Sequence, residues 1–327
     1  MTRFSGKKFF RMIGQWKQRV DENGDVLIDT DREMTRLTLQ IIGKRLFGKD
    51  LGPFLDELAK IMAQCQAHIT QRMLTVDWAK YFTTPQERVF RQNRGRLIKL
   101  IEQYLDNCPE GSIARLMAEY RDAHGTPLSR TRQVDQMLGF LAAGYETTAA
   151  GLTWSAYLLS EHPWAQAHIR ERGRAYAEQV FEETMRLYPP IPCFARVALE
   201  EDEIQGFRIP RGGTVVLPQY VTHRRPDLWK NAETFDPERF SNNRRDEIIK
   251  NSYYPFGLGP RACIGQGLAT LETAVAIEKI VTSFELLEVQ GEKPGMLALL
   301  SLRPDRSIIL RCRLVSGAGA SNNESSP

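Results

Sequence analysis

Apolar residues recur every three or four positions through most of the first half of the chain, which is the spacing of amphipathic helices. The clearest examples are residues 31–48, 55–73 and 85–107. Residues 137–160 form a longer and more continuously apolar run, which predicts a long helix through the interior of a large domain. Strand patterns are scarce here, so the sequence predicts successive helices joined by short breaks.

The second half of the chain has a different pattern of hydrophobic and polar residues. Short β-rich runs broken by Gly and Pro occupy residues 203–220, and residues 298–315 are predicted to form a hairpin. A long helix is predicted between them at residues 264–284. The predicted fold class is therefore mainly α with small β-sheets, in one domain over residues 1–315. The small, polar residues 316–327 predict a disordered tail.

Composition narrows the class of protein without identifying it. Hydrophobic residues make up 42% of the chain and charged residues 26%, as in soluble globular proteins. The 44 Lys and Arg against 40 Asp and Glu give a net charge of +4, which is too mildly basic to indicate nucleic-acid binding. The five cysteines contain no CxxC pair and follow no secretory signal, so we expect reduced thiols and a cytoplasmic protein.

Two segments have features of membrane contact. The first 20 residues are basic, with apolar side chains on one helical face, as in transit peptides and membrane-surface helices. Acidic residues resume at Asp21, so we expect an ordinary helix that faces a core, with peripheral membrane contact as the alternative. Residues 137–160 carry Glu146 near their centre, and a carboxylate is costly at mid-bilayer, so no transmembrane segment is expected.

The sharpest local pattern is PFGLGPRACIGQGLA, which begins at Pro255. Cys263 precedes a predicted helix, whose free N–H groups and positive dipole end stabilise a thiolate. Gly257 permits a tight turn that aims amide protons at the sulfur, and Gly265 lets a flat ligand approach the backbone. Arg261 supplies a cation for an acidic substituent. A soft thiolate beside a planar, acidic cofactor indicates haem iron with a cysteine ligand.

Two other interpretations fit the same loop. Gly257, Gly259 and Ala262 spell GxGxxA, as in dinucleotide-binding loops. The preceding residues 252–256 resemble a strand, but a proline and an arginine crowd the turn and no βαβ succession continues. Alternatively, Cys263 is a buried structural cysteine, which is the ordinary state of a lone Cys.

The string FGLGPRACIG, residues 256–265, matches at every fixed position the FxxGxRxCxG signature of the haem-thiolate monooxygenases, the cytochromes P450. The chain resembles this family from near residue 13 to about residue 315. The resemblance implies the cytochrome P450 fold and a thiolate-ligated haem b whose iron is bound by Cys263. Arg196 occupies the place of a family arginine that pairs with a haem propionate. The residues assigned in this way to the cofactor are Cys263, Arg261, Phe256, Gly257, Gly265 and Arg196.

A second motif lies in FEETMRLYPP. Glu183 and Arg186 are three positions apart and so share a helix face, which by itself fits a surface ion pair. In the family this ExxR pair is completed by an arginine in a PERF-like segment, and residues 237–240 are PERF. The resemblance implies a buried structural network of Glu183, Arg186 and Arg239. It also places His223 in an HRxP-like stretch, where we expect it to stabilise a loop.

The long predicted helix carries the third motif. Residues 143–148, AGYETT, match the family's oxygen-binding pattern [AG]Gx[DE]TT. Thr147 can donate to the carbonyl four positions earlier and so open the helix locally. The resemblance implies that Glu146 and Thr147 deliver protons for cleavage of the O–O bond. A Thr- and Ala-rich core helix would give the same pattern.

Together these motifs resemble a haem-dependent monooxygenase, an oxidoreductase that inserts one atom of O2 into a small hydrophobic substrate. No flavin or nicotinamide module accompanies the haem part, so electrons would come from a separate ferredoxin or flavoprotein reductase. Two other functions stay open. One is a non-catalytic fragment that binds a partner protein, and the other is a haem-thiolate isomerase or peroxygenase that needs no electron donor.

The chain departs from the family pattern in two places. The strands and early helices that the family usually has upstream are absent, so we expect a P450 fold that is incomplete at the N-terminus. Residues 163–183 leave little room for what are ordinarily two helices and a connection, so we expect an internal shortening. Missing layers would expose apolar surface and loosen the pocket.

Overall fold

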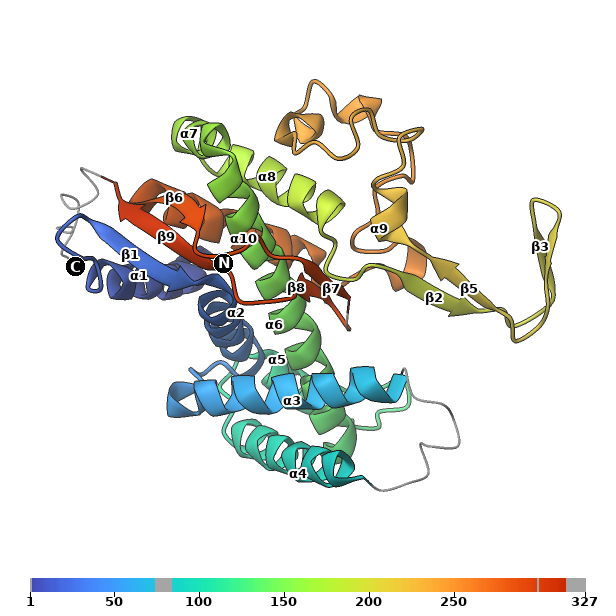
Figure 1. The fold of residues 1–327 in the computed structure, drawn as a ribbon. Helices are drawn as coiled ribbons and strands as arrows, with labels where there is room; N and C mark the ends of the chain where they lie inside the picture. Colours follow the sequence, from blue (N-terminus) through green and yellow to red (C-terminus); the bar gives the residue numbers. More distant parts are fainter. Residues whose placement is uncertain (1, 74–83, 299, 316–327) are drawn as a thin grey trace.

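The computed structural model describes residues 2–73, 84–298 and 300–315. Helices dominate up to residue 187 (Figure 1). They are α1 (Thr2–Lys17), α2 (Thr30–Phe47), α3 (Leu55–Met73), α4 (Pro85–Asp106), α5 (Ile113–Glu119), α6 (Arg130–Glu161), α7 (Pro163–Arg172) and α8 (Arg174–Leu187). The predicted helices at 31–48, 55–73 and 85–107 are confirmed as α2, α3 and α4.

Beyond α8, short strands and loops alternate with two further helices. The helices are α9 (Gln219–Thr222) and α10 (Gln266–Ser283). The strands are β2 (Phe194–Val197), β3 (Asp202–Ile204), β4 (Phe207–Ile209), β5 (Thr214–Leu217), β6 (Phe284–Val289), β7 (Met296–Ala298), β8 (Leu302–Pro304) and β9 (Ile309–Leu314). The expected fold class, mainly α with small sheets, is confirmed.

One sheet joins the two ends of the described chain. Strand β9 lies between β1 (Asp25–Asp29) and β6 and is antiparallel to both, with Cys312 opposite Val26 and Leu286. The other sheets are the antiparallel pairs β2–β5, β3–β4 and β7–β8. The predicted single hairpin at 298–315 is therefore wrong. Strand β8 turns back on β7, whereas β9 buries Leu310 and Cys312 in the core and takes partners on both edges.

Helix α6 runs through the middle of the molecule and joins two hydrophobic cores (Figure 1). Its N-terminal half, with Leu141 and Tyr145, packs in a core built mainly from α2, α3, α4 and α5. Its C-terminal half, with Ala149 and Leu152, packs in a core built from α1, α8, α10 and the β1–β9–β6 sheet. The AGYETT motif lies where the helix passes from one core to the other.

Residues 2–17, with membrane contact as an alternative, and residues 163–187, with an expected shortening, are both helical. Helix α1 buries Phe9 and Trp16 in the core, so the expected core-facing helix is confirmed. No helix in the described residues is long and apolar enough to cross a bilayer. Helices α7 and α8 are both present and are connected by Gly173 alone, with φ at 67°. The expected tail, residues 316–327, lies outside the described residues.

Candidate functional site

A bidentate ion pair lies at the centre of the candidate site. Arg186 donates from Nε to Glu183 Oε2 at 2.7 Å and from Nη2 to Glu183 Oε1 at 2.8 Å, and both side chains are fully buried. Arg239, from the 3-10 turn η3 (Pro237–Phe240), brings Nε to 3.5 Å from Glu183 Oε1. The structure therefore brings together the three side chains of the proposed network.

Backbone carbonyls satisfy the rest of the Arg186 guanidinium. Its Nη1 donates to the carbonyls of His223 at 2.8 Å and Ala232 at 2.6 Å, and its Nη2 also donates to that of Thr234 at 3.1 Å. The guanidinium carbon lies 5.2 Å from the centre of the Trp229 ring. A buried cation needs such partners, and here they fix the irregular loop after α9 against α8.

His223 connects this network to the segment before Cys263. Its carbonyl accepts from Arg186, and its ring Nε2 accepts from the backbone N–H of Tyr254 at 3.0 Å. The Tyr254 carbonyl accepts in turn from the N–H of Gly257 at 3.0 Å. Burial, together with the nearby Arg186 cation, lowers the pKa of His223 to about 3, so the ring stays a neutral acceptor. These bonds give His223 the loop-stabilising contacts that the sequence predicted.

The cysteine loop is a tight turn held by its own backbone. The N–H of Cys263 donates to the carbonyl of Phe256 at 2.8 Å, and Phe256 packs against the main core. Gly257 and Gly259 have φ values of 72° and 70°, a conformation that costs other residues energy. Helix α10 begins three residues after Cys263, which places the sulfur near the N-terminus of that helix.

The two alternative interpretations of this loop fail on geometry. Residues 252–256 form no strand, so the glycines of the loop lack the preceding strand that a dinucleotide-binding turn requires. Cys263 is exposed, so it is not a buried structural cysteine. Cys65 and Cys312 do take that buried role.

Strand β2 lies beside the cysteine loop. A Cβ placed on Gly257 would lie 3.6 Å from the ring of Phe194, the first residue of β2. Arg196, two residues along, holds its guanidinium carbon 6.0 Å from the centre of the same ring, and its Nη1 donates to the neighbouring Ala195 carbonyl. Arg261 is exposed in the loop itself and has no ion-pair partner among the residues that the structure describes. One cation therefore lies in the cysteine loop and a second on the strand beside it.

Thr147 and Glu146 are both on α6, but they have different hydrogen-bond partners. Thr147 Oγ1 donates to the carbonyl of Ala143 at 2.7 Å, which confirms the predicted bond four positions back. Glu146 is buried and accepts at Oε1 from Ser301 Oγ at 2.6 Å and from Arg303 Nε at 2.8 Å. No hydrogen bond or ion pair in the described chain links either residue to the cysteine loop.

Sequence reasoning missed the partners of Glu146. Ser301 and Arg303 lie more than 150 positions from it in the chain, and no motif signals them. Arg303 also lines a polar cavity of about 360 Å³ together with Asp31 and Tyr145. Burial raises the pKa of Asp31 above its ordinary value, in spite of Arg303 nearby.

The family is decided by comparison with known proteins. A family model described as "Cytochrome P450" matches residues 7–310. The chain belongs to the cytochrome P450 family. Its membership accounts for the order of the three motifs along α6, α8 and the cysteine loop.

Curated cytochromes P450 give the same result. The chain is 30% identical to cyclooctatin synthase of Streptomyces melanosporofaciens in an alignment that covers 81% of this chain and 63% of that protein. It is 35% identical to cytochrome P450 3A29 of Sus scrofa in an alignment that covers 56% of this chain and 40% of the relative. The chain thus spans less than two thirds of the length of these relatives.

Solved P450 structures share the fold. The heme domain of cytochrome P450DA superposes with a TM-score of 0.83 at 25% identity, covering 95% of this chain and 72% of that one. A 6-coordinated cytochrome P450 from Thermus thermophilus superposes with a TM-score of 0.73 at 30% identity, covering 96% and 77%. The expected P450 fold is therefore confirmed for nearly the whole chain.

The residues at the cysteine loop fit the haem of a cytochrome P450. The Cys263 thiol is exposed and has no hydrogen-bond partner among the described residues, so a soft donor is available. A Cβ on Gly265 would lie 3.7 Å from that sulfur, and glycine keeps this space open. Ile264 is 90% exposed and Leu258 53%, which leaves apolar surface beside the sulfur for a flat ring.

Proposed function

We propose that this chain is the haem-binding part of a monooxygenase that inserts one atom of O2 into a small hydrophobic substrate. The observation that carries the proposal is the exposed Cys263 thiol in a glycine turn before α10, within a chain of the cytochrome P450 family. The buried network around Glu183 supports it, because that network fixes the backbone on which the turn depends.

Haem b would be held by the cysteine loop and β2. Cys263 would bind the iron as a thiolate, while Phe256, Gly257 and Gly265 would border the porphyrin ring. Arg261 and Arg196, neither of which has an ion-pair partner in the described chain, would pair with the propionates. When bound, the haem supplies the iron at which dioxygen is activated, and a thiolate ligand favours O–O cleavage.

Glu146 and Thr147 would handle protons. Thr147 donates its own proton to the Ala143 carbonyl, which leaves the lone pairs of its oxygen free to accept another hydrogen bond. Glu146 accepts hydrogen bonds from Ser301 and Arg303, which fix the position of its carboxyl group. Their roles are general acid and base chemistry for oxygen reduction.

A separate protein would supply the electrons. The family motifs of this chain, between residues 143 and 265, all belong to the haem part of the family. A ferredoxin or a flavoprotein reductase would therefore dock transiently on the haem-loaded chain.

Reconstitution with haem tests the cofactor. The loaded chain, reduced under carbon monoxide, should show the absorption band typical of thiolate-ligated haem, and Cys263→Ala should abolish that band. Cys193→Ala removes another exposed thiol and serves as the matched control, which should keep the band. A band that survives in Cys263→Ala, or a wild-type chain that binds no haem, would overturn the proposal.

Turnover tests the reaction. With a surrogate ferredoxin and its reductase, the loaded chain should oxidise a hydrophobic probe in a reaction that consumes O2 and NADPH. Thr147→Ala should divert most of the electrons to hydrogen peroxide, whereas Thr147→Ser, which keeps the hydroxyl, should preserve coupling. Equal coupling in both variants would remove Thr147 from the proton role.

A further inference from the structure

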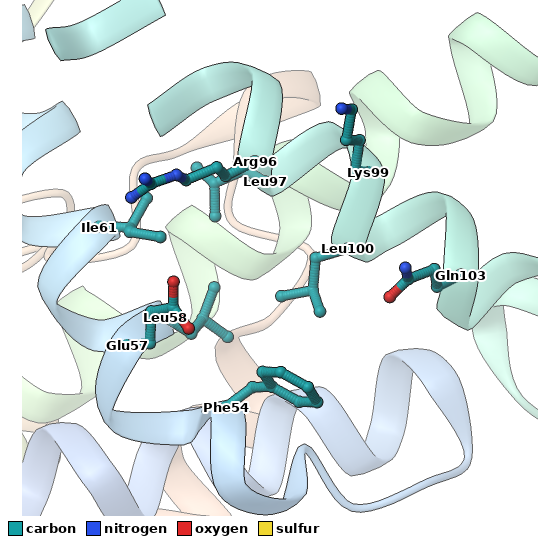
Figure 2. A pocket seen from close by; sticks show the side chains of 9 residues that line it. All are labelled: Phe54, Glu57, Leu58, Ile61, Arg96, Leu97, Lys99, Leu100 and Gln103. Carbon is teal, nitrogen blue, oxygen red and sulfur yellow. The ribbon is translucent and has the colours of Figure 1, made fainter. Parts of the chain in front are cut away.

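A cavity of about 200 Å³ opens between the start of α3 and the end of α4, on elements that the proposed function does not use (Figure 2). Five of its nine lining residues are apolar, both helices contribute to them, and an aromatic ring borders one end. Figure 2 shows the side chains of Phe54 and Leu100 facing each other across it. The apolar lining residues are Phe54, Leu58, Ile61, Leu97 and Leu100.

The lining is incompletely covered by the protein. Leu58 and Leu97 are buried, but Leu100 is half-buried and Phe54 is 49% exposed. Apolar surface of this kind gains free energy when a nonpolar guest covers it. The volume is below the roughly 300–1,000 Å³ of sites for drug-sized ligands, so a single short chain fits better than a two-chain lipid.

The rim of the cavity carries unpaired charge. Arg96 and Lys99 are three positions apart and share one face of α4, and neither forms an ion pair within the described residues. On the same helix Arg91 pairs with Glu87 at 3.0 Å, whereas Arg94, which lies outside the lining, has no ion pair among the described residues. The carboxylate of the rim, Glu57, comes from α3, so an anion is favoured on the α4 side.

We propose that this cavity binds a free medium-chain carboxylate, with its alkyl chain against the leucines and its carboxylate at Arg96. A guanidinium can receive a carboxylate through two parallel hydrogen bonds, and Lys99 adds positive charge to the same helix. The proposal does not depend on haem or on monooxygenase activity, and it assigns a second, separate site to the chain.

Ligand titration followed by methyl NMR tests the site directly. In the full, haem-loaded chain, octanoate should give saturable shifts of the Ile61 and Leu100 methyl signals. Affinity should rise about fourfold for each added methylene from hexanoate to octanoate, because each buries one more apolar group. Octylammonium should bind about tenfold more weakly. The haem absorption spectrum, recorded in parallel, separates this site from guests that bind near the iron.

Variants locate the binding. Leu100→Trp fills the cavity and should abolish the response of Ile61. Arg96→Gln should weaken octanoate about three- to fivefold and leave octanol unaffected. Arg94→Gln removes a cation from the same helix outside the lining and serves as the matched control. Because Arg96 is exposed, its variant keeps the test valid even where Leu100→Trp fails to fold.

Four outcomes would overturn the proposal. They are the absence of saturable shifts, equal affinity for octylammonium, unchanged binding in Arg96→Gln, and binding of anionic phospholipid vesicles without any response to octanoate. Loss of haem binding with intact octanoate shifts would contradict the proposed function and leave this site in place.

Discussion

The network around Glu183 and the loop around Cys263 are neighbours, but they differ in whether their polar side chains have partners within the protein. In the network, charged groups are buried and meet charges or carbonyls of the protein itself. In the loop, the backbone is hydrogen-bonded while the thiol of Cys263 and the guanidinium of Arg261 have no side-chain partners within the described chain. The side chains of the network therefore have their partners within the protein, whereas those of the loop are available to a ligand.

His223 shows how the first region supports the second. Its carbonyl belongs to the network and its ring accepts from Tyr254, whose carbonyl holds Gly257 at the start of the loop. The protein therefore fixes the position of the sulfur through the main chain and leaves the sulfur itself open. This difference predicts that substitutions in the network act on stability and substitutions in the loop act on ligand binding.

The largest effect should come from Glu183→Gln. Loss of this carboxylate leaves Arg186 and Arg239 buried without their counter-charge, which should lower the free energy of unfolding by about 3–5 kcal/mol. Urea unfolding monitored by circular dichroism measures the loss. Glu182→Gln is the control, because its partner Arg245 is about half exposed, and it should lose about 1 kcal/mol or less. Equal losses in the two variants would mean that the network is no more important than a surface pair.

The sequence predicted only part of this network. The spacing of Glu183 and Arg186 placed them on one helix face, and the PERF segment located Arg239. The carbonyls that satisfy Arg186 lie in irregular loop, and no periodicity encodes the direction of a carbonyl in such a loop. The partners could therefore be found only in the structure.

The fold, like the network, was predicted only in part from the sequence. Amphipathic periodicity predicted the long helices closely, because each helix records its buried face locally. Strand β1 was missed because it has only five residues, and β9 was paired wrongly because its partners come from both ends of the chain. Arg303 escaped notice for the same reason, since its contact with Glu146 spans 157 positions. Contacts between residues that are far apart in the chain form only when the core assembles, so no local sequence pattern predicts them.

Acid should weaken the network through His223. The ring has an unfolded pKa near 6.5 and a folded pKa lowered to about 3, so the unfolded chain binds the additional proton between these values. Its contribution to stability is complete above pH 6.5 and is lost as the pH falls toward 3. Between pH 7 and pH 5 the expected loss is about 2 kcal/mol. His223→Gln should lose less over this interval, and parallel pH profiles of the two proteins would contradict the assignment.

A smaller effect should come from the turn of the loop. Gly257 has a φ of 72°, so Gly257→Ala forces a side chain into the left-handed region and should cost about 1 kcal/mol. Gly265 has a φ of −87° and ordinary space around a Cβ, so Gly265→Ala should leave the unfolding free energy within about 0.5 kcal/mol. Thermal unfolding of the haem-free variants measures both. Haem affinity should nevertheless fall in Gly265→Ala, because the new methyl group occupies space beside the sulfur.

The smallest effect on the haem-free chain should come from Cys263→Ala, which removes an exposed thiol without a hydrogen bond and should change the unfolding free energy by less than about 0.5 kcal/mol. Cys312→Ala makes the same chemical change inside β9, where the side chain is fully buried, and should cost about 1–2 kcal/mol. Adding haem should make the effect of Cys263→Ala large. At a haem concentration 100 times its Kd the wild type should gain about 2.7 kcal/mol, and Cys263→Ala should gain much less. If Cys263→Ala destabilised the haem-free chain as much as Cys312→Ala does, the loop would be part of the protein's own structure, and the contrast with the Glu183 network would disappear.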